Sequence, residues 1–287
     1  MKSAGHHSII STMIEKETDT YKLHIKGEVQ YLTFKRLDEF PELRHLFTTR
    51  HGGISTGCRE SWDLGFSEED GPEAREYNCG VLADVMGIAQ GDMVWTQQTH
   101  TTNIRRVTED DRGKGATRPR DYTDVDGLVT DCRGIAIVTT HADCNALYFY
   151  DPARHVIGLA HSGWKGTLHR IGKVMVNKMQ ADFGSDPGEL VCGIGPSLCQ
   201  DCFEVDRDVA GMFSAADAAY GKFAYEKGVK TYIDLWAINE YILQGAGVRP
   251  ENILCMGLCT KENTDMFFSH RGQHGKRGTM AAAMLLK

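Results

Sequence analysis

The sequence lacks the features that mark membrane, secreted and nucleic-acid-binding proteins. No apolar run approaches the roughly 18 to 20 residues that a membrane-spanning helix needs. The net charge is -7 and the basic residues are scattered among acidic ones, which leaves no basic stripe to neutralise a phosphate backbone. A short apolar run within residues 1–17 is broken by Ser and Thr and lacks a small-residue cleavage site. We therefore expect no membrane span, no nucleic-acid partner and no export signal.

The cysteines are also not in a pattern that suits a disulfide framework. Nine cysteines are irregularly spaced in a chain of 287 residues, which is long enough to bury a core without covalent staples. Reduced thiols are typical of cytosolic proteins, so we predict a cytoplasmic location. With 41% hydrophobic and 25% charged residues, the composition is that of an ordinary globular protein.

The patterned part of the sequence predicts a layered α/β fold. Residues 1–30 are polar and unpatterned and are expected to form an N-terminal arm, and residues 31–287, which contain no linker or repeat, a single catalytic domain. Runs rich in β-branched and aromatic residues predict strands over 127–130, 135–139, 147–150, 156–160 and 190–194. The first four are too close together for parallel crossovers, so we expect antiparallel pairing. Apolar periodicity predicts helices over 73–86, 165–183, 205–218, 235–246 and 278–286. Together they indicate a mixed sheet with an antiparallel section flanked by helices, of α/β (α+β-like) class.

Ligand-type side chains follow several of these strands. Cys144 closes a polar loop between two apolar strands, and His161 stands at a switch from strand to helix. Taken singly, such a Cys is more often a small buried hydrophobe and such a His a hydrogen-bonded turn residue. The local signal for His100 is weaker still. Two imidazoles and one thiolate would suit a zinc ion that keeps a fourth position open for a reactant.

Six collinear segments stand out in the chain, namely FTTRHGGIS (47–55), DGLVT (126–130), HADC (141–144), AHSGWKGT (160–167), GPS (195–197) with FEV (203–205), and FFSHR (267–271). With these segments the chain resembles the YfiH/YlmD family. Members of that family are often labelled polyphenol oxidase or laccase-domain proteins and act as purine nucleoside phosphorylases. The resemblance runs from about residue 45 to residue 287.

This resemblance implies a zinc site made by His100, Cys144 and His161, the three residues that we also expect to be catalytic. It further implies phosphorolysis of adenosine, inosine, guanosine and methylthioadenosine, plus adenosine deamination, so that purine nucleosides and phosphate would be the partners. Two departures bear on substrate preference and phosphate affinity. Asp63 stands where the family usually has Asn, and Thr279 follows Gly278 where it usually has Arg.

Other charged residues near these segments suggest supporting roles. Arg50, Lys165 and the first amides of the helix expected after Gly163 are candidate phosphate holders, because a helix N-terminus offers free N–H groups. Solvated surface charge is an equally good interpretation of both cations. Asp143 is a candidate to orient a metal-bound imidazole, and it would serve equally well as a turn cap.

Three other interpretations remain open. Cys144 could be the nucleophile of a metal-free hydrolase, with His161 or His100 as its base. The zinc could instead be structural, in a partner-binding scaffold with a fourth protein ligand. Copper, which the laccase label suggests, is less favoured because the chain has no His-x-His pair.

Cys199 and Cys202 have zinc-ribbon spacing. The next pair, Cys255 and Cys259, is spaced differently and flanked by strand-like sequence, which argues against a closed Cys-rich site.

Overall fold

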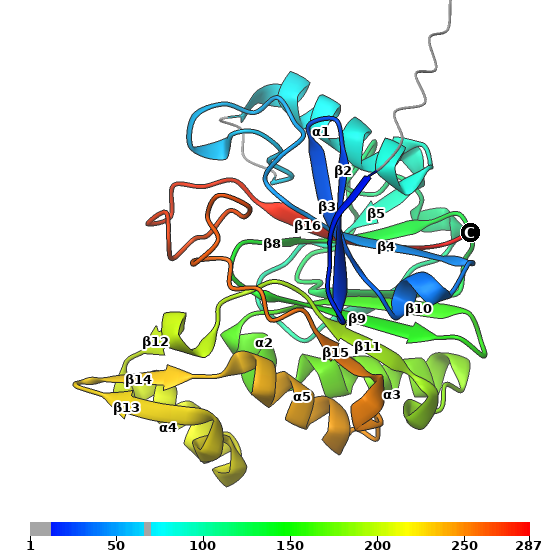
Figure 1. The fold of residues 1–287 in the computed structure, drawn as a ribbon. Coiled ribbons are helices and arrows are strands. Elements are labelled where there is room, and N and C mark those ends of the chain that lie inside the picture. The colour runs from blue at the N-terminus through cyan, green and yellow to red at the C-terminus, as the bar shows by residue number, and fades with distance from the viewer. Residues whose placement is uncertain (1–12, 66–69) are drawn as a thin grey trace, which may run out of the picture.

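The computed structural model describes residues 13–65 and 70–287 and has two stacked β-sheets between layers of helices (Figure 1). The sequence features that argued against an export signal lie largely in residues 1–12, outside the described part. In the described part no helix combines the length and the apolar character that crossing a membrane requires. The layered α/β fold with mixed sheets and flanking helices confirms the predicted fold class.

Two sheets form the centre of the molecule, and a smaller one lies at the side. The seven-stranded sheet has the order β1 (Met13–Glu17), β2 (Tyr21–Lys26), β3 (Val29–Phe34), β4 (Leu43–Thr48), β16 (Met280–Leu286), β8 (Ala136–His141), β5 (Met93–Trp95). The six-stranded sheet has the order β15 (Ile253–Cys255), β11 (Val191–Ile194), β9 (Asn145–Asp151), β10 (Val156–Ser162), β7 (Gly127–Thr130), β6 (Ile104–Arg106). The third has the order β12 (Glu204–Val205), β14 (Lys230–Ile233), β13 (Ala224–Lys227).

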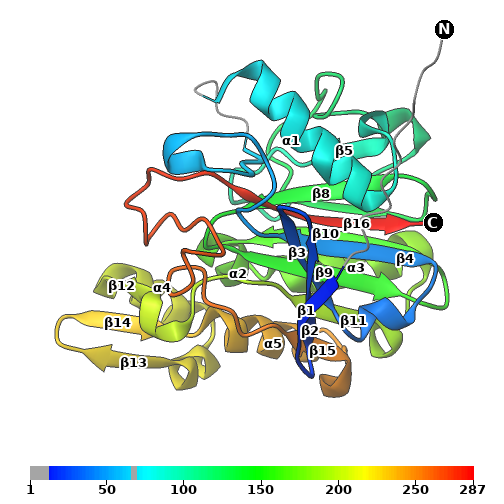
Figure 2. The ribbon, with the colours of Figure 1, turned by 45° about the horizontal axis from the view of Figure 1, so that its top comes forward.

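Helices cover the outer faces of the two large sheets (Figure 2). Helix α1 (Gly71–Met86) packs its buried residues against the outer face of the seven-stranded sheet. Helices α3 (Ile171–Phe183) and α5 (Leu235–Gly245) cover the outer face of the six-stranded sheet, and α4 (Arg207–Ala216) packs with the small sheet. A third apolar cluster fills the space between the two sheets. The order of layers is therefore helix, sheet, sheet, helix.

The last element is a strand and not the predicted helix over 278–286. Strand β16 runs antiparallel to both β4 and β8 in the middle of its sheet, and all its residues are buried. Its side chains alternate between the two faces, with Met280, Ala282 and Met284 between the sheets and Ala281 and Ala283 under α1. The Ala-rich run has high helix propensity, but burial on both faces of a central strand outweighs that preference.

Three other expectations need correction. Residues 13–26 are not an unpatterned arm, because β1 pairs with β2 and β2 pairs with β3 along its whole length. Strand β8 pairs with β16 and β5 in the other sheet, so of these four strands only β9 and β10 form an antiparallel hairpin, and β7 pairs antiparallel with β10. The helix expected over 165–183 is divided into α2 (Trp164–Leu168) and α3, because Arg170 has a left-handed φ of 59°.

One buried histidine in β4 belongs to the core and not to the cavity described below. His45 is 3% exposed, and its Nε2 accepts a hydrogen bond of 2.7 Å from the Phe34 N–H. Burial lowers the pKa of His45 to about 4; the neighbouring Asp38 carboxylate opposes this shift, whereas His24 and Lys22 add to it. The fold therefore holds this imidazole neutral, since an acceptor nitrogen cannot carry a proton.

Candidate metal centre

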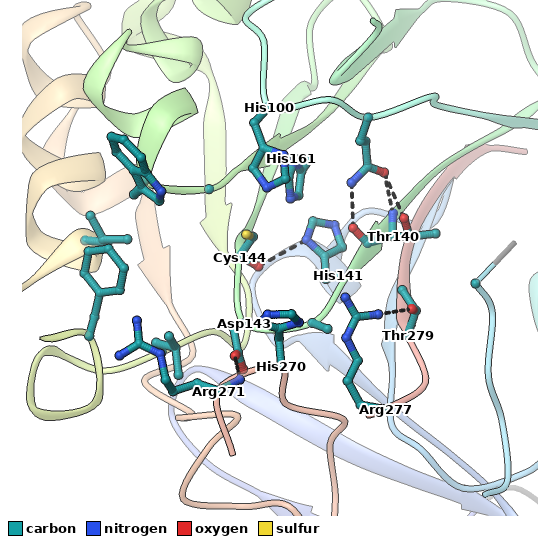
Figure 3. Close-up of a pocket in the computed structure, with 18 residues that line it drawn as sticks. His100, Thr140, His141, Asp143, Cys144, His161, His270, Arg271, Arg277 and Thr279 are labelled. Carbon is teal, nitrogen blue, oxygen red and sulfur yellow. Dashed lines mark hydrogen bonds between the residues drawn. The ribbon is translucent and has the colours of Figure 1, made fainter. Parts of the chain in front are cut away.

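The three predicted ligands come together at one end of the six-stranded sheet (Figure 3). Their ligand atoms all lie within 4.8 Å of one another. Cys144 directly precedes β9, and His161 lies near the end of β10. These two strands are antiparallel neighbours, and His161 of β10 is paired with Ala146 of β9. The β9–β10 register therefore brings the thiol beside the imidazole. His100 comes from the loop that follows β5.

Asp126 ties the His100 loop to His161. Its carboxylate accepts hydrogen bonds from the backbone N–H groups of Thr99 (3.1 Å), His100 (3.0 Å) and Thr101 (2.8 Å). The same carboxylate pairs with Nδ1 of His161 at 2.9 Å. Asp126 is fully buried, so these contacts satisfy a carboxylate that is removed from water. They also hold His100 at a φ of 65°, which a non-glycine residue adopts at some cost in energy.

This contact leaves Nε2 as the ligand nitrogen of His161. A metal-bound imidazole usually donates its other N–H to a carboxylate, which fixes the tautomer and the ring orientation. Burial raises the pKa of the Cys144 thiol, but the neighbouring His161 and His100 outweigh this and lower it to about 6. Burial disfavours the charged form of His161, but Cys144 and Asp126 outweigh this and raise its pKa to about 9. The chain therefore favours a thiolate at Cys144, the form that binds a metal.

Gly163 allows the cluster to be compact. A Cβ atom at this position would lie 2.9 Å from Cδ2 of His100 and 3.0 Å from Sγ of Cys144, closer than ordinary van der Waals contact. The residue itself has an ordinary extended backbone, with φ -70° and ψ 180°. Glycine is therefore needed at this position because there is no room for a Cβ atom, and not because the backbone conformation is unusual.

The donor set fits a zinc ion. Imidazole nitrogen and thiolate are ligands that zinc takes, and three protein ligands leave a fourth tetrahedral position open, as in catalytic zinc sites. The neighbouring His141 is not part of the set, since its ring is held by Thr139 Oγ1 at 2.7 Å and by the Cys144 carbonyl at 3.2 Å. Burial lowers the pKa of His141 well below its usual value, which keeps this ring neutral beside the cluster.

The cluster opens onto a cavity of about 450 Å³. One part of its wall is apolar and includes Trp164, Leu198, Phe203 and Leu235, and another part carries cationic or titratable side chains of the loop before β16, namely His270, Arg271 and Arg277. Figure 3 shows the Arg277 side chain directed toward His141, whereas the Arg271 side chain extends away from Cys144 and His270. The volume is in the range of pockets that bind small organic ligands.

Arg277 is only partly satisfied by hydrogen bonds within the protein. Its Nη1 donates to Thr279 Oγ1 at 2.7 Å, while its buried Nε has no hydrogen-bond partner among the described residues. Burial lowers the pKa of this guanidinium, and the nearby Asp63, Asp143 and Cys144 counteract that shift. A half-buried guanidinium that lines a cavity is suited to bind an anion.

The structure places the other predicted site residues elsewhere. Arg50 donates to the carbonyls of Glu60 and Thr264 and stacks over the Phe268 ring at 4.7 Å, so it joins loops and does not line the cavity. Lys165 is exposed and lies 5.6 Å from the Trp164 ring centroid, outside the cavity lining. Helix α2, whose first amides were a further candidate, has only five residues.

Asp143 does line the cavity, but its carboxylate contacts other groups than an imidazole. It accepts hydrogen bonds from Thr260 Oγ1 at 2.7 Å and from the backbone N–H of Arg271 at 2.6 Å. The carboxylate that pairs with an imidazole of the cluster is instead that of Asp126. The sequence interpretation missed Asp126, His270, Arg271 and Arg277 as site residues, although the first three stand inside quoted family segments and could have been singled out there.

Comparisons with known proteins agree with this fold. A family model described as multi-copper polyphenol oxidoreductase laccase matches residues 44–287. The purine nucleoside phosphorylase YlmD of Bacillus subtilis is 35% identical over 246 residues, which cover 84% of this chain and 87% of the relative. A purine nucleoside phosphorylase of Deinococcus radiodurans is 34% identical over 240 residues, covering 84% and 88%.

Solved structures give the same result. The crystal structure of the hypothetical protein YfiH of Bacillus licheniformis has a TM-score of 0.84 and 31% identity, covering 94% of this chain and 98% of that one. YlmD of Geobacillus stearothermophilus has a TM-score of 0.80 and 28% identity, covering 96% and 100%. This is a layered α/β protein of the laccase-domain class. Within that class the chain belongs to the YfiH/YlmD family, which confirms the resemblance seen in the sequence.

Proposed function

We propose that this protein is a cytoplasmic, zinc-dependent purine nucleoside phosphorylase that also deaminates adenosine. The observation that carries the proposal is the junction of the His100, Cys144 and His161 cluster with a cavity that has an apolar wall and a cationic wall. A purine is a flat apolar ring with polar edges and phosphate is an anion, so the two halves of the cavity match the two substrates. The names of the relatives support the same activity.

In phosphorolysis the bond between C1′ of the ribose and N9 of the purine breaks, and a phosphate oxygen forms the new bond to C1′. The base leaves with the electron pair of the broken bond and takes up a proton, while positive charge develops on the ribosyl group. The chain must therefore hold a phosphate anion beside C1′. We assign this role to Arg277 and Arg271, which line the cavity together with His270; Arg271 Nη1 also donates to the Glu204 carbonyl at 3.3 Å.

The apolar residues of the cavity orient the base. Trp164 and Phe203 offer aromatic faces for stacking on a purine, and Leu198 and Leu235 complete that wall and exclude water. When bound, a zinc ion with an open position supplies Lewis-acid polarisation or activation of a water molecule, chemistry that replacement of the purine amino group by oxygen requires. Asp126 keeps His161 and the His100 loop in place for that ion.

The test is incubation of the protein with phosphate and adenosine, inosine, guanosine or methylthioadenosine. We expect free base and ribose 1-phosphate (or its methylthio analogue), and also inosine from adenosine. His100→Ala, Cys144→Ala and His161→Ala should lose activity together with bound zinc. Arg277→Gln should raise the KM for phosphate roughly 10-fold or more and leave zinc content unchanged, because a charge-assisted contact is worth about 1.5 kcal/mol or more. Arg36→Gln, an exposed control paired with Glu39, should change neither.

The metal-free hydrolase is the second candidate, because a thiolate beside a protonated imidazole also suits nucleophilic catalysis. The two candidates differ in metal content. Metal-free protein that is active and is inactivated by alkylation at Cys144 would establish the hydrolase and contradict the phosphorylase. A copper oxidase is less supported, since the second ligand-type group among the described residues contains no histidine.

A further inference from the structure

A second group of ligand-type side chains lies beside the cavity and takes no part in the metal centre. It consists of Cys199, Cys202, Cys259 and Glu262, whose sulfur and carboxylate oxygen atoms all lie within 4.8 Å of one another. Cys202 Sγ and Glu262 Oε1 are 3.8 Å apart. Cys202 and Cys259 are buried, Cys199 is half-buried and Glu262 is exposed. We call these residues the Cys3Glu group.

Strand topology explains why these residues meet. Cys199 and Cys202 follow β11, Cys259 and Glu262 follow β15, and these two strands are parallel neighbours whose ends lie at the same edge of the sheet. The loops stay paired beyond the strands, because the Ser197 N–H donates to the Leu258 carbonyl at 3.1 Å and the Thr260 N–H to the Ser197 carbonyl at 3.0 Å.

Both loops present their ligand-type residues with the same spacing. Cys-x-x-Cys on one loop faces Cys-x-x-Glu on the other, and two intervening residues are typical of zinc ligand pairs. The sequence interpretation took Cys255 as the partner of Cys259. The structure corrects this, because Cys255 lies within β15 and is not a member of the group.

We propose that the Cys3Glu group binds a second zinc ion, or another thiophilic divalent cation, in a closed site with four protein ligands. Three thiolates and one carboxylate form a tetrahedral donor set that suits zinc, whereas calcium and magnesium prefer oxygen ligands throughout. Zinc–sulfur bonds of about 2.3 Å place tetrahedral sulfur atoms roughly 3.8 Å apart. The group needs to contract by about 1 Å at most to reach that geometry.

The position of the site indicates what the ion does. Leu198 and Phe203 directly flank the segment from Cys199 to Cys202, and both line the cavity. Thr260, the residue after Cys259, donates to Asp143 Oδ1 at 2.7 Å. Since Asp143 directly precedes Cys144, this hydrogen bond connects the Cys3Glu group with the first cluster. Four protein ligands leave no open position for a reactant, so this ion is structural and fixes the apolar wall. The effect on turnover rests on the proposed function: loss of the ion should raise the KM for nucleoside more than it lowers kcat.

The direct test is metal analysis of the full chain after gentle purification. We expect about two zinc ions per chain in the wild type and about one in Cys259→Ala. The matched control Cys255→Ala removes a half-buried thiol only four residues away and should keep the wild-type content. Cys259→Ala should lose about one ion whatever the first cluster binds, so the result does not depend on the nucleoside activity. Unchanged zinc in Cys259→Ala would overturn the proposal.

A spectroscopic measurement avoids dependence on a core substitution. In the His100→Ala/His161→Ala variant the Cys3Glu group is intact, and added cobalt(II) should give an intense near-ultraviolet thiolate-to-cobalt absorption. Glu262→Gln, at an exposed position, should weaken that cobalt binding by at least roughly 10-fold, the loss that even outer-shell changes produce. Absence of the thiolate band, or a Cys199–Cys202 disulfide found by mass spectrometry after anaerobic purification, would overturn the site.

Discussion

Gly163→Ala tests whether the compactness of the first cluster matters for metal binding. The added Cβ would lie 2.9 Å from Cδ2 of His100 and 3.0 Å from Sγ of Cys144, against the 3.4–4 Å of ordinary contact. One or both ligands must therefore move by ~0.5 Å, while metal–ligand distances tolerate about 0.2 Å. We expect zinc affinity to fall roughly 10- to 100-fold, as it does when ligand orientation is disturbed.

The fold itself should tolerate this change. Gly163 has φ -70° and ψ 180°, which alanine adopts readily, so the free energy of unfolding should change by less than about 1 kcal/mol. Zinc affinity is measured by competition with a chromogenic chelator, and stability by urea unfolding of the metal-free protein. The matched control is Gly166→Ala, whose Cβ would find its nearest neighbour, the His161 carbonyl oxygen, at 3.4 Å. Wild-type affinity in Gly163→Ala, or an equal loss in Gly166→Ala, would refute the steric reasoning.

Asp126→Asn keeps the shape of the side chain but removes the charge that orients His161, so zinc affinity in the chelator assay should fall 10-fold or more; unchanged affinity would contradict this role. Arg50→Met removes three hydrogen bonds to backbone carbonyls and should lower the free energy of unfolding by about 2 kcal/mol. The KM for phosphate should not change; a raised KM would show that Arg50 binds phosphate. His45 is neutral when folded, with a pKa of about 4 against 6.5 unfolded. The free energy of unfolding should therefore fall by up to ~3 kcal/mol between pH 6.5 and pH 4, because the unfolded imidazole takes up a proton that the folded one does not. In His45→Gln the free energy of unfolding should depend less on pH in that range.

Period and spacing were sufficient to predict most of the central strands and to single out Cys144 and His161, whereas His100 became a candidate ligand only through the resemblance to the YfiH/YlmD family. The strands near 127–160 are bounded by turn residues and rich in β-branched side chains, and the structure has strands at these positions. The strand over 280–286 could not be found in this way. Its Ala-rich composition favours a helix locally, and only its place between β4 and β8, which are far away in the sequence, decides otherwise.

The supporting residues of the site were hidden for a related reason. Asp126 is 35 positions from His161, and a lone acidic residue before a strand carries no sign of its partner. Arg277 stands in a loop without regular structure, where a charge is usually solvated, and its partly buried position follows from the packing of that loop over the cavity. The Cys3Glu group depends on which two strands are neighbours. Sequence proximity favoured Cys255, whereas the β11–β15 register selects Cys259 and Glu262.

Strand direction accounts for the location of both clusters. β5 and β8 are parallel and β16 is antiparallel to them, so the ends of the first two and the start of the third lie at one edge of the seven-stranded sheet. In the other sheet β9 runs against β10 and β11, and β15 runs with β11, so the start of β9 lies beside the ends of the other three. Loops from these strand ends supply the cavity, the first cluster and the Cys3Glu group. Because the loops after β11 and β15 line the cavity without supplying residues to the first cluster, changes there should alter the choice of nucleoside while the proposed metal binding at Cys144 is unchanged.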